Sequence, residues 1–568
     1  MSKGFEPSDL FTMWRLFKVP LLLGVVYLVA ASVVALPVQG WLHFVSPHVP
    51  LPLQVVLLVG LAGSVTFLVV AYRRSKPEGS GAHGTARWGS GRELQKETGV
   101  LLGRRLAGQW REARRRNAQG KLLRYDGEGH LLTVAPTRSG KGTGAVIPNL
   151  LTYPGSVVVT DPKGENYAVT TSRRRALGSK TLALDPFGLV GGHAAFNPLD
   201  LVDADGPDAL DDAAMLADML VVPDGRRDAT SDFWQGEAKA LLAGLVLHVA
   251  ATETGPDRSL VRVRELLSLP PKELTRLLED DMLRSDACGG LVQRAAARIL
   301  QKAEKERSGV ISTAQTHTHF LDSPRMARVL TRSSFDLAEL KHPAGDHESL
   351  SLYLVLPPER IDTYRGWLRL VVACALLTMS RVPGVPRRRV LFLLDEFANL
   401  GRLAPVERAV SLAAGYGAQL WLFLQDLTQL RAVYPETWGS FLANAAVLQA
   451  FGTADEHTAE YLSRMTGQAT VRAESEGTTS GTSYGLQVPG FQRGGSRGRS
   501  ETGRALYLPD EVRRMPPEEQ LLFVKGRDPV RARKLRYFED EEFAGLYNLN
   551  PLHGTLPAAL TSPLRVGT

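Results

Sequence analysis

Beyond residue 129, short apolar runs alternate with helix-like segments. The runs at 130–134, 156–160 and 181–185 are mostly apolar, and each is followed by polar or turn residues. Strands buried on both faces of a parallel sheet have this character, because neither face requires polar side chains. The pattern therefore predicts an α/β core.

The strand pattern stops between residues 200 and 330. This stretch includes the helix-like segments 233–251 and 291–306, and it contains no comparable apolar run bounded by turns. A segment of about 130 residues has an ordinary domain size. We therefore expect an all-α domain inserted into the α/β core.

The α/β pattern then resumes and predicts a parallel sheet covered on both faces by helices. The expected strands are 351–356, 389–397, 419–425 and 446–452, with a helix at 364–379 and a last edge strand at 521–526. Residues 472–503 are rich in Gly, Ser, Thr and Arg, which predicts a flexible excursion.

The N-terminal region carries two uncharged apolar stretches, 19–36 and 51–72. Each can cross a hydrocarbon core, which requires about 20 helical residues. Basic residues flank the pair but not the connecting loop: Arg15, Lys18, Arg73, Arg74 and Lys76. The positive-inside rule then places both termini in the cytoplasm, on a hairpin in a bacterial inner membrane. A cleaved signal peptide is the alternative for the first stretch.

These patterns predict six regions. They are a transmembrane hairpin anchor (1–75), a basic juxtamembrane linker (76–128), the first part of a nucleotide-binding domain (129–199), the all-α insertion (200–330), the second part (331–540) and a tail (541–568). The net charge of +8 favours anionic partners. The arginines of the linker, Arg104 and Arg105 among them, form either a patch for DNA or lipid headgroups or a solvated surface. The two cysteines, Cys288 and Cys374, indicate neither a zinc site nor a disulfide framework.

The segment APTRSGKGTG, residues 135–144, follows the expected strand 130–134 and precedes a helix. A phosphate-binding loop occupies this context and has the pattern G-x-x-x-x-G-K-[ST]. Ala135 replaces the first Gly, and Gly142 replaces the hydroxyl residue that binds magnesium. Ala135 is tolerated if its φ is negative. The expected ATP-binding residues are Thr137, Arg138, Ser139, Gly140, Lys141, Gly142 and Thr143. Either Thr143 or water completes the Mg²⁺ shell, and Pro148 should kink or shorten the following helix.

A second motif ends the strand 389–397, where Asp395 and Glu396 follow five apolar residues. Carboxylates at the tip of a buried parallel strand lie where ligands bind, so Asp395 is expected to hold Mg²⁺ and Glu396 to act as general base. Gln425 ends the neighbouring strand, either as a γ-phosphate sensor or as a helix-entry residue. Asp161 and Lys163 also end a strand, with an Asp-Pro helix cap as the alternative.

With these motifs in view, the chain resembles the TraG family of type IV secretion coupling proteins. The similarity rests on residues 135–165, LDPF (184–187), LLDEFANLG (393–401) and FGTADEHTAEYLS (451–463), and extends over most of 120–530. The resemblance implies an inner-membrane ATPase related to RecA and FtsK motors, with ATP and Mg²⁺ as cofactors. It also implies a homohexamer that passes relaxase–DNA complexes or protein effectors to the secretion channel. Many members share the Lys-Gly of the loop, and their helical insertion recruits substrates.

Two other functions fit parts of the sequence. An FtsK-like DNA translocase is disfavoured, because the chain has two apolar spans rather than several and shows no winged-helix-like DNA reader at its C-terminus. A scaffold that binds nucleotide without hydrolysing it is disfavoured by Glu396. Arg402 and Arg408 are weak candidates for an arginine acting in trans. The sequence does not distinguish DNA from protein cargo.

Overall fold

The structure is a computed structural model that describes residues 81–106, 120–222, 229–484 and 489–552. The two apolar stretches predicted to form a membrane hairpin lie outside these residues. Among the residues described, no helix is both long and apolar enough to cross a membrane. The membrane anchor therefore stays a prediction.

Within the described residues, eleven strands form one mixed sheet in the order β2-β1-β13-β12-β9-β3-β8-β7-β4-β6-β5. The strands are β1 (Val100–Arg105), β2 (Leu122–Tyr125), β3 (His130–Val134), β4 (Val157–Asp161), β5 (Ser179–Leu184), β6 (Ser349–Val355), β7 (Val390–Leu394), β8 (Ala418–Leu424), β9 (Ala445–Ala450), β12 (Glu519–Val524) and β13 (Val530–Arg533). From β9 to β5 all neighbours pair in parallel. This half confirms the predicted α/β core.

Both faces of the parallel half are buried. Side chains alternate between two apolar clusters: Val158 and Phe392 lie in one, whereas Val159 and Leu393 lie in the other. The first cluster includes residues of α14 (Ile361–Arg381), and the second includes residues of α5 (Ile147–Thr152). Burial on both sides explains why these strands are continuous apolar runs.

The other half of the sheet corrects two predictions. The strand expected at the edge, β12, lies between β9 and β13, and β12, β13, β1 and β2 pair antiparallel. Strand β1 belongs to the segment predicted to be a basic linker. Its Arg104 is buried rather than on the surface, because Asp540 accepts a hydrogen bond from its Nε at 3.0 Å and Glu542 pairs with its Nη2. Strand formation there is possible because carboxylates distant in sequence compensate the buried charge.

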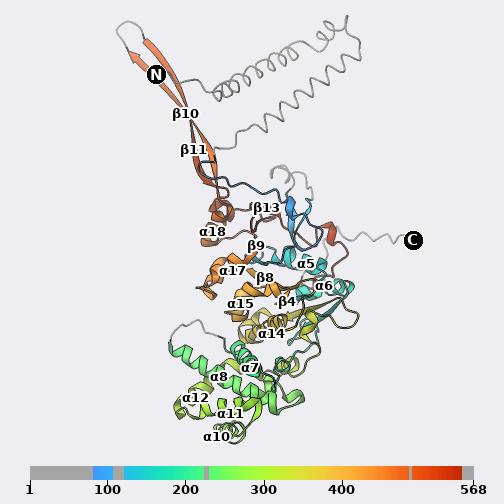
Figure 1. Cartoon of the computed structure of the whole chain (residues 1–568). Helices are drawn as coiled ribbons and strands as arrows, with labels where there is room; N and C mark the ends of the chain where they lie inside the picture. The colour runs from blue at the N-terminus through green and yellow to red at the C-terminus, as the bar shows by residue number, and fades with distance from the viewer. Residues whose placement is uncertain (1–80, 107–119, 223–228, 485–488, 553–568) are drawn as a thin grey trace, which may run out of the picture. The chain divides into compact units, whose positions relative to one another are not determined.

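Residues 472–503 were expected to form a flexible excursion, but the described part of this stretch, 472–484 and 489–503, belongs to two paired strands, β10 (Gln468–Tyr484) and β11 (Pro489–Ala505). They form a long antiparallel ribbon, with pairing from Gln468↔Ala505 to Tyr484↔Pro489 (Figure 1). Composition rich in Gly, Ser and Thr permits this pairing because the ladder uses backbone groups, which every residue except proline supplies in full.

Helices occupy the chain between β5 and β6, as predicted. Within the described part of this stretch, the α-helices are α7 (Ala209–Leu220), α8 (Ala229–Thr252), α9 (Leu260–Leu267), α10 (Pro271–Arg276), α11 (Ala287–Leu300), α12 (Glu304–Thr318) and α13 (Pro324–Leu330). The group α7, α8, α10, α11 and α12 appears in green in Figure 1. The expected helix 291–306 is divided, because α11 ends at Leu300 and α12 begins at Glu304. The assignment of domain boundaries stays a prediction.

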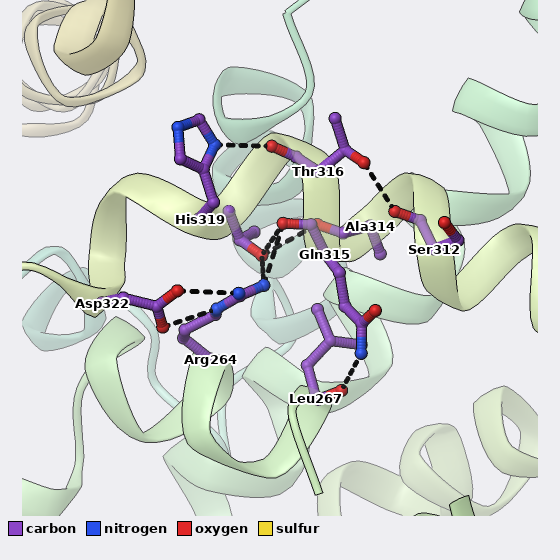
Figure 2. A network of polar contacts seen from close by, with 9 residues as sticks. Arg264, Leu267, Ser312, Ala314, Gln315, Thr316, His319 and Asp322 are labelled. Atoms are coloured by element: carbon purple, nitrogen blue, oxygen red, sulfur yellow. Dashed lines mark hydrogen bonds and ion pairs between the residues drawn. The ribbon is translucent and has the colours of Figure 1, made fainter.

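Arg264 joins α9 to the α12 region (Figure 2). Its Nε and Nη2 donate to the two carboxylate oxygens of Asp322 at 2.8 Å each, and its Nη1 donates to the carbonyl of Gln315 at 2.9 Å. Gln315 returns a hydrogen bond from its amide to the carbonyl of Leu267 at 3.0 Å. These bonds fix the relative position of the two helices inside the insertion.

Pro148 does not end the helix after the phosphate loop. The helix continues to Thr152, and the turn before the proline, Gly142–Val146, is π-helical. Proline lacks an N–H and its ring clashes with the carbonyl four residues earlier in a regular α-helix. The wider π turn relieves this conflict, so the proline changes the helix locally without stopping it.

The remaining described α-helices lie outside the insertion. The α-helices are α6 (Glu165–Ala176), α15 (Ala404–Leu412), α16 (Leu427–Val433), α17 (Trp438–Asn444), α18 (Glu456–Thr466) and α19 (Pro509–Arg513). Helix α14 spans 361–381, slightly more than the predicted 364–379. The segment that was expected to be a featureless tail contributes Phe543, which is fully buried.

Candidate nucleotide-binding site

The loop after β3 has the backbone conformation of an anion-binding turn. Arg138 and Gly140 have positive φ values of 63° and 92°, and the N–H of Gly144 donates to the carbonyl of Gly140 at 2.8 Å. Alternating backbone conformations of this kind turn successive N–H groups toward one side, where a helix begins. Ala135 is buried and is not among the residues with positive φ, so the missing first glycine costs nothing here.

Gly142 and Thr143 share the first turn of the helix. A Cβ added to Gly142 would meet no atom within 4 Å, so packing does not require glycine at this position. The hydroxyl of Thr143 donates to the carbonyl of Gly140 at 3.2 Å. Its oxygen keeps lone pairs for a metal ion, so this bond does not exclude magnesium binding.

Lys141 lies against the second predicted motif. Its Nζ is 3.0 Å from Oδ1 of Asp395, and it donates to Oε1 of Glu396. All three side chains are largely buried. The fold explains this meeting, because β3 and β7 flank β8 and all three strands are parallel with their carboxyl ends at one edge.

Burial and the neighbouring charges have opposite effects on the pKa values of Lys141 and Asp395. Burial acts to lower the pKa of Lys141, but the two carboxylates outweigh it and raise the pKa, so the ammonium stays charged. Burial raises the pKa of Asp395, although the Lys141 ammonium pulls it downward. The site thus holds concentrated charge in a poorly hydrated place, where electrostatic interactions with a polyphosphate would be strong.

Glu396 adopts a left-handed backbone conformation, with φ of 50°. Non-glycine residues in this region store strain and cluster at functional sites. Gln425, at the end of β8, donates from Nε2 to Oε2 of Glu396 at 3.1 Å. The helix-entry role belongs instead to Asp426, whose carboxylate accepts the N–H of Gln429 at 2.8 Å and caps α16.

The structure places Asp161 in the helix-cap role, the alternative that the sequence left open. Its carboxylate accepts the N–H groups of Asn166 at 3.3 Å and Tyr167 at 2.8 Å, which satisfies the start of α6. Burial raises its pKa to about 7 despite these bonds. Lys163 is exposed. Asp161 therefore organises the end of β4 beside the site.

Sequence reasoning missed Lys534, just after β13. Its Nζ donates to the carbonyl of Ser139 in the loop at 3.1 Å and to that of Phe451 at 3.2 Å. No motif surrounds this lysine, and its partners are backbone carbonyls. The one available signal was its position after a short strand, and that strand had not been predicted.

The weak arginine candidates lie near each other on the chain. Arg402 pairs with Glu407 at 3.1 Å. An arginine acting in trans would contact a neighbouring subunit, and this role stays a prediction. No cluster of three or more His, Cys, Asp or Glu side chains suited to a metal exists in the part of the chain that is described. Mg²⁺ at nucleotide sites usually needs only one or two protein ligands besides phosphate and water.

Comparison with known proteins identifies the family. The sequence model described as "Type IV secretory system Conjugative DNA transfer" matches residues 92–553. The chain belongs to this family. The predicted resemblance to TraG-family coupling proteins is therefore confirmed.

Members of the conjugative DNA transfer family are similar over most of their length. Conjugal transfer protein TraG of Escherichia coli is 31% identical over 537 residues, covering 86% of this chain and 82% of that protein. VirD4 of Rhizobium radiobacter is 27% identical, covering 89% and 70%. Among solved structures, the conjugative coupling protein TrwB with sulphate superposes with a TM-score of 0.59 at 18% identity, covering 79% of this chain and 93% of TrwB. TrwB with ADP and Mg²⁺ gives 0.58 at 17%. These likenesses support a shared α/β fold with a large mixed sheet.

Proposed function

We propose that this chain is an inner-membrane coupling ATPase that uses hydrolysis of ATP to drive substrate transfer in type IV secretion. The single observation that carries the chemistry is the convergence of Lys141, Asp395, Glu396 and Gln425 at one edge of the sheet. These are the residue types that phosphoryl transfer by P-loop enzymes requires. The family's conjugative process supplies the biological context.

Each residue has a distinct role in this proposal. The N–H groups of the loop 137–143 and the ammonium of Lys141 bind the phosphates. Glu396 accepts a proton from the attacking water, and Gln425 orients that carboxylate through its hydrogen bond. Asp395 and the Thr143 hydroxyl are the groups that would hold Mg²⁺, which supplies charge neutralisation between the phosphates when bound. The TrwB complex with ADP and Mg²⁺ supports the choice of cofactors.

The partners follow from the family. We propose relaxase–DNA complexes or protein effectors as cargo, components of the type IV secretion channel as docking partners, and a homohexamer as the working form. The hairpin 1–75 would anchor the assembly in the inner membrane with both termini cytoplasmic. The FtsK-like alternative is not favoured, because the matching family is one of conjugative DNA transfer.

The decisive experiment compares ATP hydrolysis by the full chain and by variants Lys141→Ala and Asp395→Asn, with and without DNA. Loss of hydrolysis by about 100-fold or more is expected from either change. Lys239→Ala is a matched control, since Lys239 forms a lysine–aspartate pair with Asp218 in the helical insertion. Hydrolysis by Lys141→Ala at the wild-type rate would overturn the assignment of the site.

A further inference from the structure

The segment after β13 packs directly on the phosphate loop. The N–H of Tyr537 donates to the carbonyl of Thr143 at 3.3 Å. A Cβ on Gly144 would lie 2.9 Å from the carbonyl oxygen of Leu535, so glycine is needed there for the close approach. Lys534 opens this segment, which places its side chain beside the loop.

Lys534 is a buried cation whose polar contacts are carbonyl oxygens. It is 6% exposed, and its Nζ lies 4.5 Å from the ring centroid of Phe451 as well as donating to the carbonyls of Ser139 and Phe451. Among the described residues, no acidic side chain forms an ion pair with it. Burial, assisted by the charge of Arg536, lowers the pKa of Lys534 to about 8 although the carboxylate of Glu518 acts in the opposite direction, so most molecules still carry the charge at pH 7.

Two lysines therefore reach one loop in different electrostatic states. Lys141 forms ion pairs with Asp395 and Glu396, whereas the carboxylate of Glu518 acts on Lys534 without forming an ion pair with it. A buried charge that lacks a directly paired counter-charge is costly, and an anion bound nearby reduces that cost. A nucleotide phosphate on the loop is an anion of this kind.

The hydrogen bond to Ser139 also orients the loop. In a trans peptide the carbonyl of one residue and the N–H of the next point in opposite directions. Lys534 holds the Ser139 carbonyl on its own side of the loop, so the N–H of Gly140 points to the other side. Without this bond, the peptide between Ser139 and Gly140 would be freer to rotate and the N–H would be less well placed for an anion.

We propose that Lys534 is a positioning residue of the nucleotide site, which orients the Ser139–Gly140 peptide for phosphate binding and adds positive charge beside it. The proposal rests on the ATPase function proposed above. Because Lys534 follows β13, a residue next to the antiparallel half of the sheet would then contribute to nucleotide affinity. The nucleotide's phosphates are the ligand concerned, whether ATP or ADP carries them.

The test uses the full chain with the substitution Lys534→Met, which keeps the length of the side chain and removes its charge and its donor. We expect the Kd for ADP with Mg²⁺ and the KM for ATP to rise about tenfold, with kcat changed by less than about threefold. Lys525→Met is the matched control, because Lys525 is exposed and lies in the turn between β12 and β13. It should behave as wild type.

Several results would contradict the proposal. Unchanged ADP affinity and KM in Lys534→Met would do so, including the case where only thermal stability falls. If Lys534→Met does not fold, Lys534→Gln replaces it, since it removes the charge but keeps a polar group, and wild-type affinity in that variant overturns the role of the charge. A wild-type protein that neither binds ADP nor hydrolyses ATP would instead overturn the proposed function.

Discussion

The two halves of the sheet differ in where they place their polar side chains. In the parallel half, β7 (Val390–Leu394) is wholly apolar and buried, and the polar groups of the nucleotide site gather at the carboxyl ends of the strands. Lys141, Asp395, Glu396 and Gln425 meet there and remain partly exposed. Toward the antiparallel half, by contrast, buried polar side chains lie inside the strands themselves.

A chain of hydrogen bonds crosses the junction between the halves. Trp421 Nε1 donates to Thr133 Oγ1 at 2.7 Å, and Thr133 Oγ1 donates to Gln449 Oε1 at 2.8 Å. Gln449 Nε2 then donates to Gln520 Oε1 at 2.6 Å, and Gln520 Nε2 donates to the carbonyl of Leu102 at 2.8 Å. Each group is satisfied by the protein itself, so this chain stabilises one arrangement of the strands.

Similar polar side chains therefore have different functions according to their position in a strand. Polar groups at the strand ends can exchange protein partners for a ligand. Polar groups inside the strands have no access to a ligand and instead hold the strands in register. The strand before the phosphate loop, β3, contributes Thr133 to this internally bonded region, and the strand before Lys534, β13, lies between β12 and β1, which contain Gln520 and Leu102. The junction therefore supports the site without contributing to its chemistry.

The largest expected effect lies at the strand ends. Glu396→Gln should reduce ATP hydrolysis by about 10²–10⁴-fold while ADP binding is retained, because the amide cannot act as a base. Single-turnover hydrolysis together with a binding measurement tests this. Glu279→Gln, at an exposed position of the helical insertion, serves as the control and should hydrolyse ATP normally. Hydrolysis by Glu396→Gln at the wild-type rate would remove Glu396 from the mechanism. Absence of hydrolysis in wild type as well would favour a nucleotide-binding scaffold.

The next effect concerns the internal chain of hydrogen bonds. Gln449→Leu keeps the volume but leaves the buried Thr133 hydroxyl without its acceptor and the buried Oε1 of Gln520 without its donor. The free energy of unfolding should fall by about 3 kcal/mol, since each unsatisfied buried group costs about 1–3 kcal/mol. Denaturant-induced unfolding measures this, with the exposed Gln301→Leu as control. A change no larger than that of the control would show that the chain of bonds is not important for stability.

The sequence predicted the parallel half well for a physical reason. Strand β3 coincides with the predicted 130–134, and β7 and β8 lie within the predicted ranges or one residue from them. Burial on both faces makes such strands apolar throughout, which a single sequence reveals directly. The same topology explains why Lys141, Asp395, Glu396 and Gln425 could be placed together before the structure was known.

The sequence did not reveal the antiparallel half, because the partners of its buried charged residues lie far away in the sequence. Strand β1 contains Arg104, whose partners Asp540 and Glu542 are more than 400 residues away. Locally such an arginine predicts an exposed surface. Strand β12 begins with Glu519 and Gln520, both buried, and Glu519 pairs with Arg531 of β13. Without knowledge of these pairs, charge inside a segment argues against a strand.

A smaller effect distinguishes two roles of Gln425 at the end of β8: orienting Glu396 or forming the start of α16. Gln425→Ala removes the hydrogen bond to Glu396 and should lower kcat about tenfold with little change in ADP affinity. Gln429→Ala is the matched control, since the Gln429 side chain only accepts the backbone N–H of Gln425 within this helix entry. Steady-state kinetics of both variants decide between the roles. Equal losses in the two would indicate that Gln425 acts through the start of α16 and not through Glu396.

The smallest expected effects concern the hydroxyl of the phosphate loop. Gly142→Ser should fold normally and change ATP hydrolysis by less than about threefold, because a Cβ at this position meets no atom within 4 Å. If the Thr143 hydroxyl helps to bind Mg²⁺, Thr143→Ala should raise the Mg²⁺ concentration needed for half-maximal hydrolysis by about fivefold. The double variant Gly142→Ser, Thr143→Ala should then recover most of that loss, since a hydroxyl returns at the position found in other phosphate loops. Titration of Mg²⁺ at saturating ATP measures all three. An unchanged Mg²⁺ requirement in Thr143→Ala would mean that water, together with Asp395, provides the coordination that Gly142 cannot.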